Sequence, residues 1–503
     1  MRPNILLISA DQHRADCFGF QGRKVKTPHL NALAAAGTVF DACITPCVVC
    51  QPARASILTG QLPRTHGVHD NGIDLDPAIG EKGFAGMLGA AGYDTAYFGK
   101  AHFSTYHTFE ATGTPECLKS SVRYPEDWHG PYMGFEHVEL MLVGHNWWAP
   151  ETPPGGQHYE RWFHADGRGD EKIKAMWENG GDTKGAAQTW HSKLPVEWHN
   201  STWTANQAID WLAQPHADPF CAWVSFPDPH HPFDAPEPWS HLHDPAEVDL
   251  PAHRTRDFTG RPWWHEKVLT AEPQGAGADI RKNYSRIPPQ SDAQLREIIA
   301  NTYGQIALID HNVGRILDAL EAQGLAENTI VIYISDHGDW LGDHGLILKG
   351  PMHYEGLLRV PLIIRGPGVP AGERVDAPVS TLDMLPTFAE LAETAPLHPI
   401  HGASLCPLWQ GRGRRDHAYN EWELLPTRAG VGLSLRTVRT RTHKLTVDMT
   451  SGAGELYDLV DDPHELKNLW DDPNAVTAQE ALMAKALARP DDMRPIQTQV
   501  GMA

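Results

Sequence analysis

The sequence predicts an α/β fold with a mostly parallel sheet, helices on both faces of that sheet, and a smaller C-terminal α+β subdomain. Short apolar runs alternate with helix-like segments along most of the 503 residues, and this alternation is typical of parallel sheets. After about residue 415 the pattern changes to shorter alternating segments, such as His443 to Asp448. We therefore predict a main α/β domain at residues 1–415 and a C-terminal subdomain with a tail at residues 416–503.

The individual elements follow from apolar runs and from residues that begin or end helices. Asn4 to Ala10 is a short, mainly apolar run, which predicts a buried strand followed directly by Asp11 and Gln12. Further strands are expected at 92–98, 220–226, 328–335 and 359–365, and helices at 27–37, 54–58, 202–212 and 292–323. Residues 110–200 and 234–290 have weak periodicity and are expected to form long insertions over a site.

The composition argues against two classes of partner. The chain carries 42 Lys and Arg residues and 63 Asp and Glu residues, a formal charge of −21, which disfavours binding to nucleic acid. No apolar stretch approaches the length of a membrane span. The apolar run near the start is too short for a signal peptide, and the seven scattered cysteines indicate reduced thiols. We therefore expect a cytoplasmic protein with no membrane partner.

Polar side chains gather at four predicted strand ends: Asp11-Gln12, Lys100 with His102, His230-His231, and Asp336-His337. In open parallel sheets the functional groups lie beyond the C-terminal ends of the strands, so these clusters are expected to face one site. Two carboxylates, one amide oxygen and one imidazole make a set that suits a divalent metal ion, namely Asp11, Gln12, Asp336 and His337. Taken singly, each of the two acids could instead cap a turn or a helix.

Cys50, in the stretch CVVCQPARAS, leaves three interpretations open. It could be an inert core thiol, which is the commonest role of a free cysteine. It could join Cys43 and Cys47 in a zinc or iron–sulfur site of a non-enzymatic metal-binding protein, although a compact second thiol pair is missing. It could be a nucleophile, or the precursor of one, held close to Arg54 and the metal.

Several segments resemble the motifs of one family. Cys50-Gln-Pro-Ala-Arg54 is similar to the C-x-P-x-R signature of the sulfatases, which belong to the alkaline phosphatase superfamily. Other family motifs are matched in the same order by residues 3–12, 92–103, 228–233, 329–350 and 455–470. The matches span almost the whole chain. This resemblance implies a large mixed, mostly parallel sheet sandwiched by helices.

The resemblance also implies the chemistry of position 50. In this family a formylglycine-generating enzyme, which reads the proline and arginine of the motif, oxidises the cysteine to Cα-formylglycine. The hydrated aldehyde at Cys50 would attack the sulfur of a small anionic ester, helped by one divalent metal ion. The remaining hydroxyl would then lose its proton, and collapse of the hemiacetal would release sulfate.

Matching positions imply roles for the other site residues. Arg54 would hold the diol, while Lys100 and Lys349 would bind the sulfate oxygens as charge spreads over them. His102 corresponds to the base that triggers hemiacetal collapse. His230 corresponds to the acid or hydrogen-bond partner of the leaving oxygen, with Lys349 as the competitor for that role. Asn71 is expected to line the pocket, and the resemblance also implies a homo-oligomer.

Two departures from the common pattern affect the metal and the substrate. Asp11-Gln12 and Asp336-His337 replace the usual Asp-Asp and Asp-Asn, as in the branch of phosphonate monoester hydrolases and related bacterial arylsulfatases. Imidazole makes Mn²⁺ a candidate beside Ca²⁺, and a phosphonate monoester or phosphodiester becomes the alternative substrate. Lys100 and His102 resemble the sulfatase element, so a sulfate ester, and an aryl sulfate in particular, is favoured. The insertions contain tryptophans that could contact an aromatic group or pack in a core: Trp147, Trp148, Trp162 and Trp203.

Overall fold

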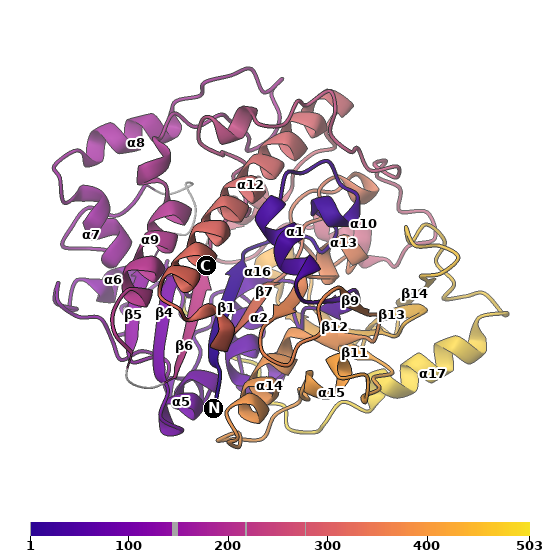
Figure 1. Cartoon of the computed structure of the whole chain (residues 1–503). Coiled ribbons are helices and arrows are strands. Elements are labelled where there is room, and N and C mark those ends of the chain that lie inside the picture. The colour runs from indigo at the N-terminus through magenta and orange to yellow at the C-terminus, as the bar shows by residue number, and fades with distance from the viewer. Residues whose placement is uncertain (1, 143–148, 217–218, 277, 503) are drawn as a thin grey trace.

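An eight-stranded sheet forms the centre of the molecule (Figure 1). The computed structural model describes residues 2–142, 149–216, 219–276 and 278–502. In sheet order the strands are β5 (His137–Met141), β4 (Asp94–Lys100), β6 (Phe220–Ser225), β1 (Asn4–Ala10), β7 (Thr329–Ser335), β8 (Leu362–Arg365), β2 (Thr38–Phe40) and β9 (Glu373–Val375). The first five run parallel, whereas β8 is antiparallel to both β7 and β2. The expected mixed, mostly parallel sheet is confirmed.

Helices cover both faces of this sheet, and the side chains of β1 alternate between them. Ile5 and Leu7 belong to a buried cluster with α2 (Cys50–Thr59), α5 (Phe84–Ala90) and α14 (Met384–Leu391). Leu6 and Ile8 belong to a second cluster with α1 (Pro28–Ala35), α9 (Asn200–Leu212) and α12 (Asp292–Ala322). Successive residues of a strand point to opposite faces. A strand buried on both sides therefore appears in the sequence as an almost continuous apolar run.

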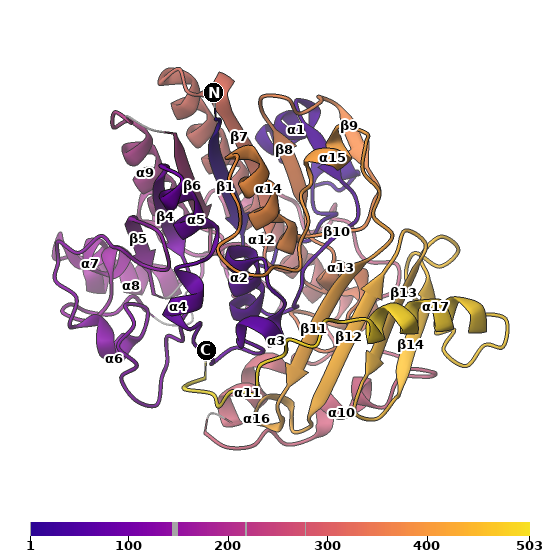
Figure 2. The same ribbon diagram turned by 90° about the horizontal axis from the view of Figure 1, so that it is seen from below.

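A second, antiparallel sheet follows the main one in the chain (Figure 2). Its strands, in order, are β11 (Ala418–Leu424), β12 (Leu433–Arg439), β13 (His443–Asp448) and β14 (Gly454–Asp458). Helix α17 (Val476–Leu487) packs Leu482 and Ala486 on one face. The other face contributes Trp422 and Leu435 to a cluster with Cys47 of the main domain. The expected α+β subdomain is confirmed, while its boundary near residue 415 stays a prediction.

Shorter elements fill the connections. A two-stranded sheet pairs β3 (Cys43–Ile44) with β10 (Val379–Ser380). The shorter helices are α3 (Pro63–His66), α4 (Pro77–Gly80), α6 (Leu118–Ser121), α7 (His158–His164), α8 (Gly169–Trp177), α10 (Trp264–Thr270), α11 (Ala278–Ser285), α13 (Glu355–Leu358), α15 (Cys406–Trp409) and α16 (Pro426–Ala429). Among the described residues, none of the helices combines the length and the apolar character that a membrane span requires.

Three elements differ from the expectation. Helix α2 begins at Cys50 rather than near residue 54, because Pro52 lies in the first turn, where its missing N–H costs little. Strand β8 begins at Leu362, after Pro361. The segment 110–200 is more than an insertion, since it supplies β5 to the edge of the main sheet.

Two of the four tryptophans expected in the insertions pack in or against the interior. Trp203 is fully buried in a small cluster with Tyr159, and Trp162 packs against the same cluster. Trp147 and Trp148 lie outside the described residues.

Gly99 tests how tightly the sheet is packed beside the site. Its φ is +101°, and a Cβ there would lie 2.2 Å from the Ser225 carbonyl oxygen. We expect Gly99→Ala to lower the free energy of unfolding by about 2 kcal/mol or more, from backbone strain and the clash. Gly89, inside α5 with open space around it, is the matched control, and Gly89→Ala should stabilise by about 0.5–1 kcal/mol. Equal effects of the two substitutions in urea unfolding would contradict this account.

Candidate active site

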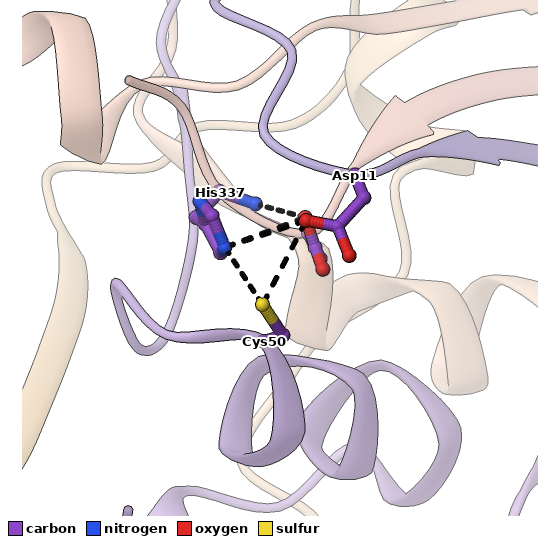
Figure 3. A group of neighbouring side chains, drawn as sticks. Asp11, Cys50 and His337 are labelled. Atoms are coloured by element: carbon purple, nitrogen blue, oxygen red, sulfur yellow. Dashed lines mark hydrogen bonds and ion pairs between the residues drawn. The ribbon is translucent and has the colours of Figure 1, made fainter. Parts of the chain in front are cut away.

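Cys50 is the first residue of α2, and it points toward the ends of β1 and β7 (Figure 3). All ten residues of this helix are buried. The N–H of Gln51 lies in the first turn, where backbone N–H groups have no partner inside the helix, and it donates to Oδ1 of Asn71 at 3.1 Å. Arg54 follows one turn later and lies on the same face of the helix as Cys50. The spacing of the C-x-P-x-R motif therefore presents a thiol and a guanidinium to the same site, with the helix N-terminus favouring negative charge at Cys50.

The two predicted acids meet at the end of neighbouring strands. Ala10 of β1 pairs with Ser335 of β7, and Asp11 and Asp336 follow them directly. Ligand atoms of Asp11, Asp336, His337 and Cys50 all lie within 4.8 Å of one another. Cys50 Sγ is 3.1 Å from His337 Nε2 and 3.7 Å from Asp11 Oδ1 (Figure 3).

Arg54 links the two buried carboxylates. Its Nε lies 2.9 Å from Asp336 Oδ2, and its Nη2 lies 3.3 Å from Asp11 Oδ2. Lys100, the last residue of β4, places Nζ 2.6 Å from the same Asp11 oxygen. The side chains of Arg54 and both acids are almost completely buried. Charges taken out of water are tolerated only when they are paired in this way.

Lys349 reaches into the cluster from the loop that follows β7. Its Nζ donates to Cys50 Sγ at 3.1 Å and to Gln12 Oε1 at 3.2 Å. It also contacts His337 Nε2 at 3.2 Å and His230 Nε2 at 2.7 Å. One ammonium group thus joins side chains from three strand ends and from α2.

The charges perturb the titration of the acids and the thiol. Burial raises the pKa of Asp11, but the charges of Lys100 and Arg54 outweigh it and hold that pKa well below its usual range. Burial and the Asp11 carboxylate together raise the pKa of Asp336. For Cys50, burial and Asp11 raise the pKa, yet Lys349 and Lys100 bring it well below the ordinary value. The cations therefore favour the ionised forms of the Cys50 thiol and of Asp11, whereas the Asp11 carboxylate shifts Asp336 toward its neutral form.

These donors fit a divalent cation. The ring Nδ1 of His337 lies 2.8 Å from the Gly338 carbonyl oxygen, so it carries the proton and leaves a lone pair on Nε2. The amide Nε2 of Gln12 donates to Asp339, which turns its Oε1 toward Lys349. The carboxylates of Asp11 and Asp336 and the imidazole of His337 converge, and the Gln12 amide oxygen lies 3.2 Å from Lys349 Nζ, which also contacts His337; the four as a metal set stay a prediction. A cation among them would relieve the repulsion of the two acids.

His102, His230 and Asn71 complete the set of expected residues. Burial lowers the pKa of His102, although a hydrogen bond to Cys50 opposes the change, so its ring is neutral at pH 7. His230 is fixed by its Nδ1, 2.6 Å from the His231 carbonyl oxygen. Asn71 uses its Oδ1 to hold the first turn of α2, and its lining of the pocket stays a prediction.

Three residues that hold the site in place were not predicted from the sequence. Asp339 accepts hydrogen bonds from Gln12 and from the N–H of Leu348, next to Lys349. Glu116 accepts the N–H groups of the turn at His102 and beyond. Ser225 donates to the Lys100 carbonyl oxygen and accepts from Arg54. None of the three could be assigned from the sequence: Asp339 and Glu116 accept N–H groups that are positioned by local turns, and the partners of Ser225 come from β4 and α2.

The thiol-cluster alternative finds no support among the described residues. Cys43 and Cys47 pack in two different apolar clusters. Burial raises the pKa of both thiols well above its ordinary value. Neither belongs to a group of potential metal ligands in the described part of the chain, so both behave as core side chains.

Comparison with known proteins identifies the family. A family model described as Sulfatase matches residues 3–394. The chain belongs to the sulfatase family. A further model, described as the C-terminal part of N-sulphoglucosamine sulphohydrolase, matches residues 342–491. This sulfatase is thus a member of the alkaline phosphatase superfamily, as its motifs predicted.

Its relatives cover nearly the full chain. It is 30% identical to the uncharacterized sulfatase YidJ of Escherichia coli over 94% of this chain and 84% of that protein. It is 29% identical to an arylsulfatase of Clostridium perfringens, covering 93% and 90% of the two chains. The solved phosphonate monoester hydrolase of Agrobacterium radiobacter is 28% identical, with a TM-score of 0.77 and coverage of 97% and 95%.

Arg54 offers a test of the buried charge cluster. We expect Arg54→Met to lower the free energy of unfolding by about 3–5 kcal/mol in chelator-treated protein, because two buried carboxylates lose their shared partner. Arg168, whose pair with Glu171 is largely exposed, is the matched control. Arg168→Met should leave denaturant unfolding almost unchanged, and an equally mild effect at Arg54 would contradict the role assigned to this side chain.

Proposed function

We propose that this protein hydrolyses sulfate monoesters, aryl sulfates among them, and that Cys50 is converted to Cα-formylglycine before the enzyme acts. The observation that carries the proposal is the position of the Cys50 sulfur, 3.1 Å from both His337 Nε2 and Lys349 Nζ and 3.7 Å from Asp11 Oδ1. Relatives named arylsulfatase and choline-sulfatase, 29% and 28% identical, support the same class of substrate.

Asp11, Gln12, Asp336 and His337 would hold one divalent cation, Ca²⁺ or Mn²⁺. Such a cation supplies Lewis acidity beside position 50, where formylglycine supplies a hydrated aldehyde as the nucleophile. The chain itself fixes this arrangement through Arg54, which contacts both acids, and through Asp339, which orients the amide of Gln12.

Two lysines suit the binding of the sulfate group. Lys349 Nζ lies beside Cys50 Sγ, and Lys100 Nζ contacts Asp11 on the other side of the cluster. Positive groups held in place before the reaction stabilise the charge that develops on the sulfate oxygens. Because Lys100 is buried, its charge is poorly screened by water, which strengthens this effect.

Proton transfer would use His102 and His230, the latter together with Lys349. His102 is neutral at pH 7, since its pKa is lowered mainly by burial, and it can therefore accept a proton from the group at position 50. Lys349 Nζ donates to His230 Nε2 at 2.7 Å. A proton held between these two nitrogens is available to the leaving oxygen of the ester, so they act as one unit.

A phosphonate monoester or phosphodiester is the second candidate substrate. The 28% identity to a phosphonate monoester hydrolase over almost the whole chain favours it, as do Gln12 and His337 in the proposed metal set. Both ester types carry a single negative charge. Lys100 and His102 favour the sulfate ester, because the phosphonate branch resembled by this chain carries neutral hydroxyl residues there.

The mass of the peptide that contains Cys50 tests the modification. We expect a mass about 18 Da below that of the thiol in protein from its native host, since CH₂SH becomes CHO. The Cys50→Ala variant should show no such difference and no turnover of nitrophenyl sulfate. An intact thiol in protein that turns over sulfate esters would refute the proposed nucleophile.

Comparison of two esters tests the substrate class. We expect kcat/KM for nitrophenyl sulfate to exceed that for a matched nitrophenyl phosphonate ester. The double variant Lys100→Thr with His102→Thr replaces the two residues that favour sulfate. Its kcat/KM for nitrophenyl sulfate should fall by about 100-fold or more, because the charge that stabilises the sulfate oxygens is lost. The phosphonate value should fall less. A preference of the unmodified sequence for the phosphonate would reverse the order of the two candidates.

A further inference from the structure

A second group of potential metal ligands lies on and beside β5, at the edge of the main sheet, where ligand atoms of His129, Glu139 and His158 all lie within 4.8 Å of one another. His137 of the same strand also contacts Glu139, at 3.4 Å. His137 of β5 pairs with Ala96 of β4, four residues before Lys100. At about 3.3 Å per residue, this places the group roughly 13 Å from the strand end that carries Lys100. It is therefore separate from the candidate active site.

The backbone brings three side chains together there. The N–H of Val138 donates to the His129 carbonyl oxygen at 2.8 Å. In the segment between them, Tyr132 and Phe135 pair with each other in an antiparallel β-bridge. The chain thus turns back on itself and sets His129 beside β5. His137 and Glu139 lie two residues apart in the strand, so their side chains project from the same face.

Both imidazoles point at one carboxylate oxygen. His129 Nδ1 lies 2.7 Å from Glu139 Oε1, and His137 Nε2 lies 3.4 Å from the same atom. The two rings are nearly parallel, at 5° with 5.5 Å between their centroids. The Glu139 side chain is 11% exposed, whereas those of His129 and His137 are 43% and 34% exposed. The carboxylate is thus the inner member of a group that opens to solvent on its histidine side.

His158 belongs to this group by distance, but both of its ring nitrogens are hydrogen-bonded to the backbone. Its Nδ1 accepts the N–H of Leu140 at 2.9 Å, and its Nε2 donates to the Trp128 carbonyl oxygen at 2.7 Å. Although its ring packs 4.8 Å from that of His129, both of its nitrogens are used. His158 thus links Trp128, which precedes His129, to Leu140, which follows Glu139. These links hold His129, His137 and Glu139 close together before any metal binds.

We propose that His129, His137 and Glu139 form a second metal site, which binds Zn²⁺ or a similar transition-metal ion and leaves its fourth position to water. Two imidazoles and one carboxylate are a known zinc ligand set, and the histidines disfavour Ca²⁺ and Mg²⁺, which bind through oxygen. A bound ion would fasten the turn at residues 129–136 to the exposed edge of the sheet. It would take no part in ester hydrolysis.

Zinc binding to the full-length protein after chelator treatment tests this site. We expect the unmodified sequence to bind one more equivalent of Zn²⁺ than the double variant His129→Ala with His137→Ala, measured by equilibrium dialysis and metal analysis. Co²⁺ should give a four-coordinate visible absorption that the double variant lacks. His417, a partly exposed histidine paired with the Asp416 carboxylate, provides the control, and His417→Ala should bind as the unmodified sequence does.

Thermal unfolding separates metal binding from a purely structural role. Relative to its own melting temperature in chelator, the unmodified sequence should gain more from Zn²⁺ than the double variant does. Glu139→Gln, which keeps the shape of the side chain, should weaken binding of this equivalent at least about tenfold. Equal stoichiometry and equal affinity for Zn²⁺ in the double variant and the unmodified sequence would overturn the proposal.

Discussion

The contact on which the rest of the site depends is the one between Arg54 and the two carboxylates at the ends of β1 and β7. Asp11 and Asp336 are buried side by side, where like charges repel strongly and water cannot screen them. The guanidinium joins them through separate nitrogens, and it also contacts the Lys100 carbonyl oxygen and Ser225. One residue of α2 therefore fixes the positions of the ends of four strands, β1, β4, β6 and β7, relative to the helix that begins with Cys50.

The surrounding fold explains how so much charge is kept out of water. Apolar side chains on both faces of β1, β6 and β7 hold the strands rigidly, and the charged residues of the site follow the strand ends. Non-glycine residues near the site adopt left-handed conformations, with φ of +70° at Gln12, +53° at His102 and +72° at Leu348, next to Lys349. Strain of this kind persists where the surroundings enforce it, and it is concentrated at functional sites.

Much of this could be predicted from the sequence, and the exceptions have physical causes. The apolar runs located β1, β6 and β7, and the residues after them proved to converge. Strand β5 was not predicted because His137 and Glu139 lie on one of its faces, so that its residues do not form a continuous apolar run. The start of α2 was misplaced because Pro52 is compatible with a first turn. Asp339 and Glu116 could not be assigned, since their partners are backbone N–H groups set by local turns.

The complete burial of α2 has a consequence for the timing of maturation. In the folded protein Cys50 is 2% exposed and Arg54 is not exposed at all. An enzyme that recognises both side chains cannot reach them once the helix has packed. The proposed oxidation of Cys50 would therefore have to precede folding of the main domain, on the growing or still extended chain. Under the same proposal, a molecule that folds first would keep its thiol and stay inactive until it unfolds again.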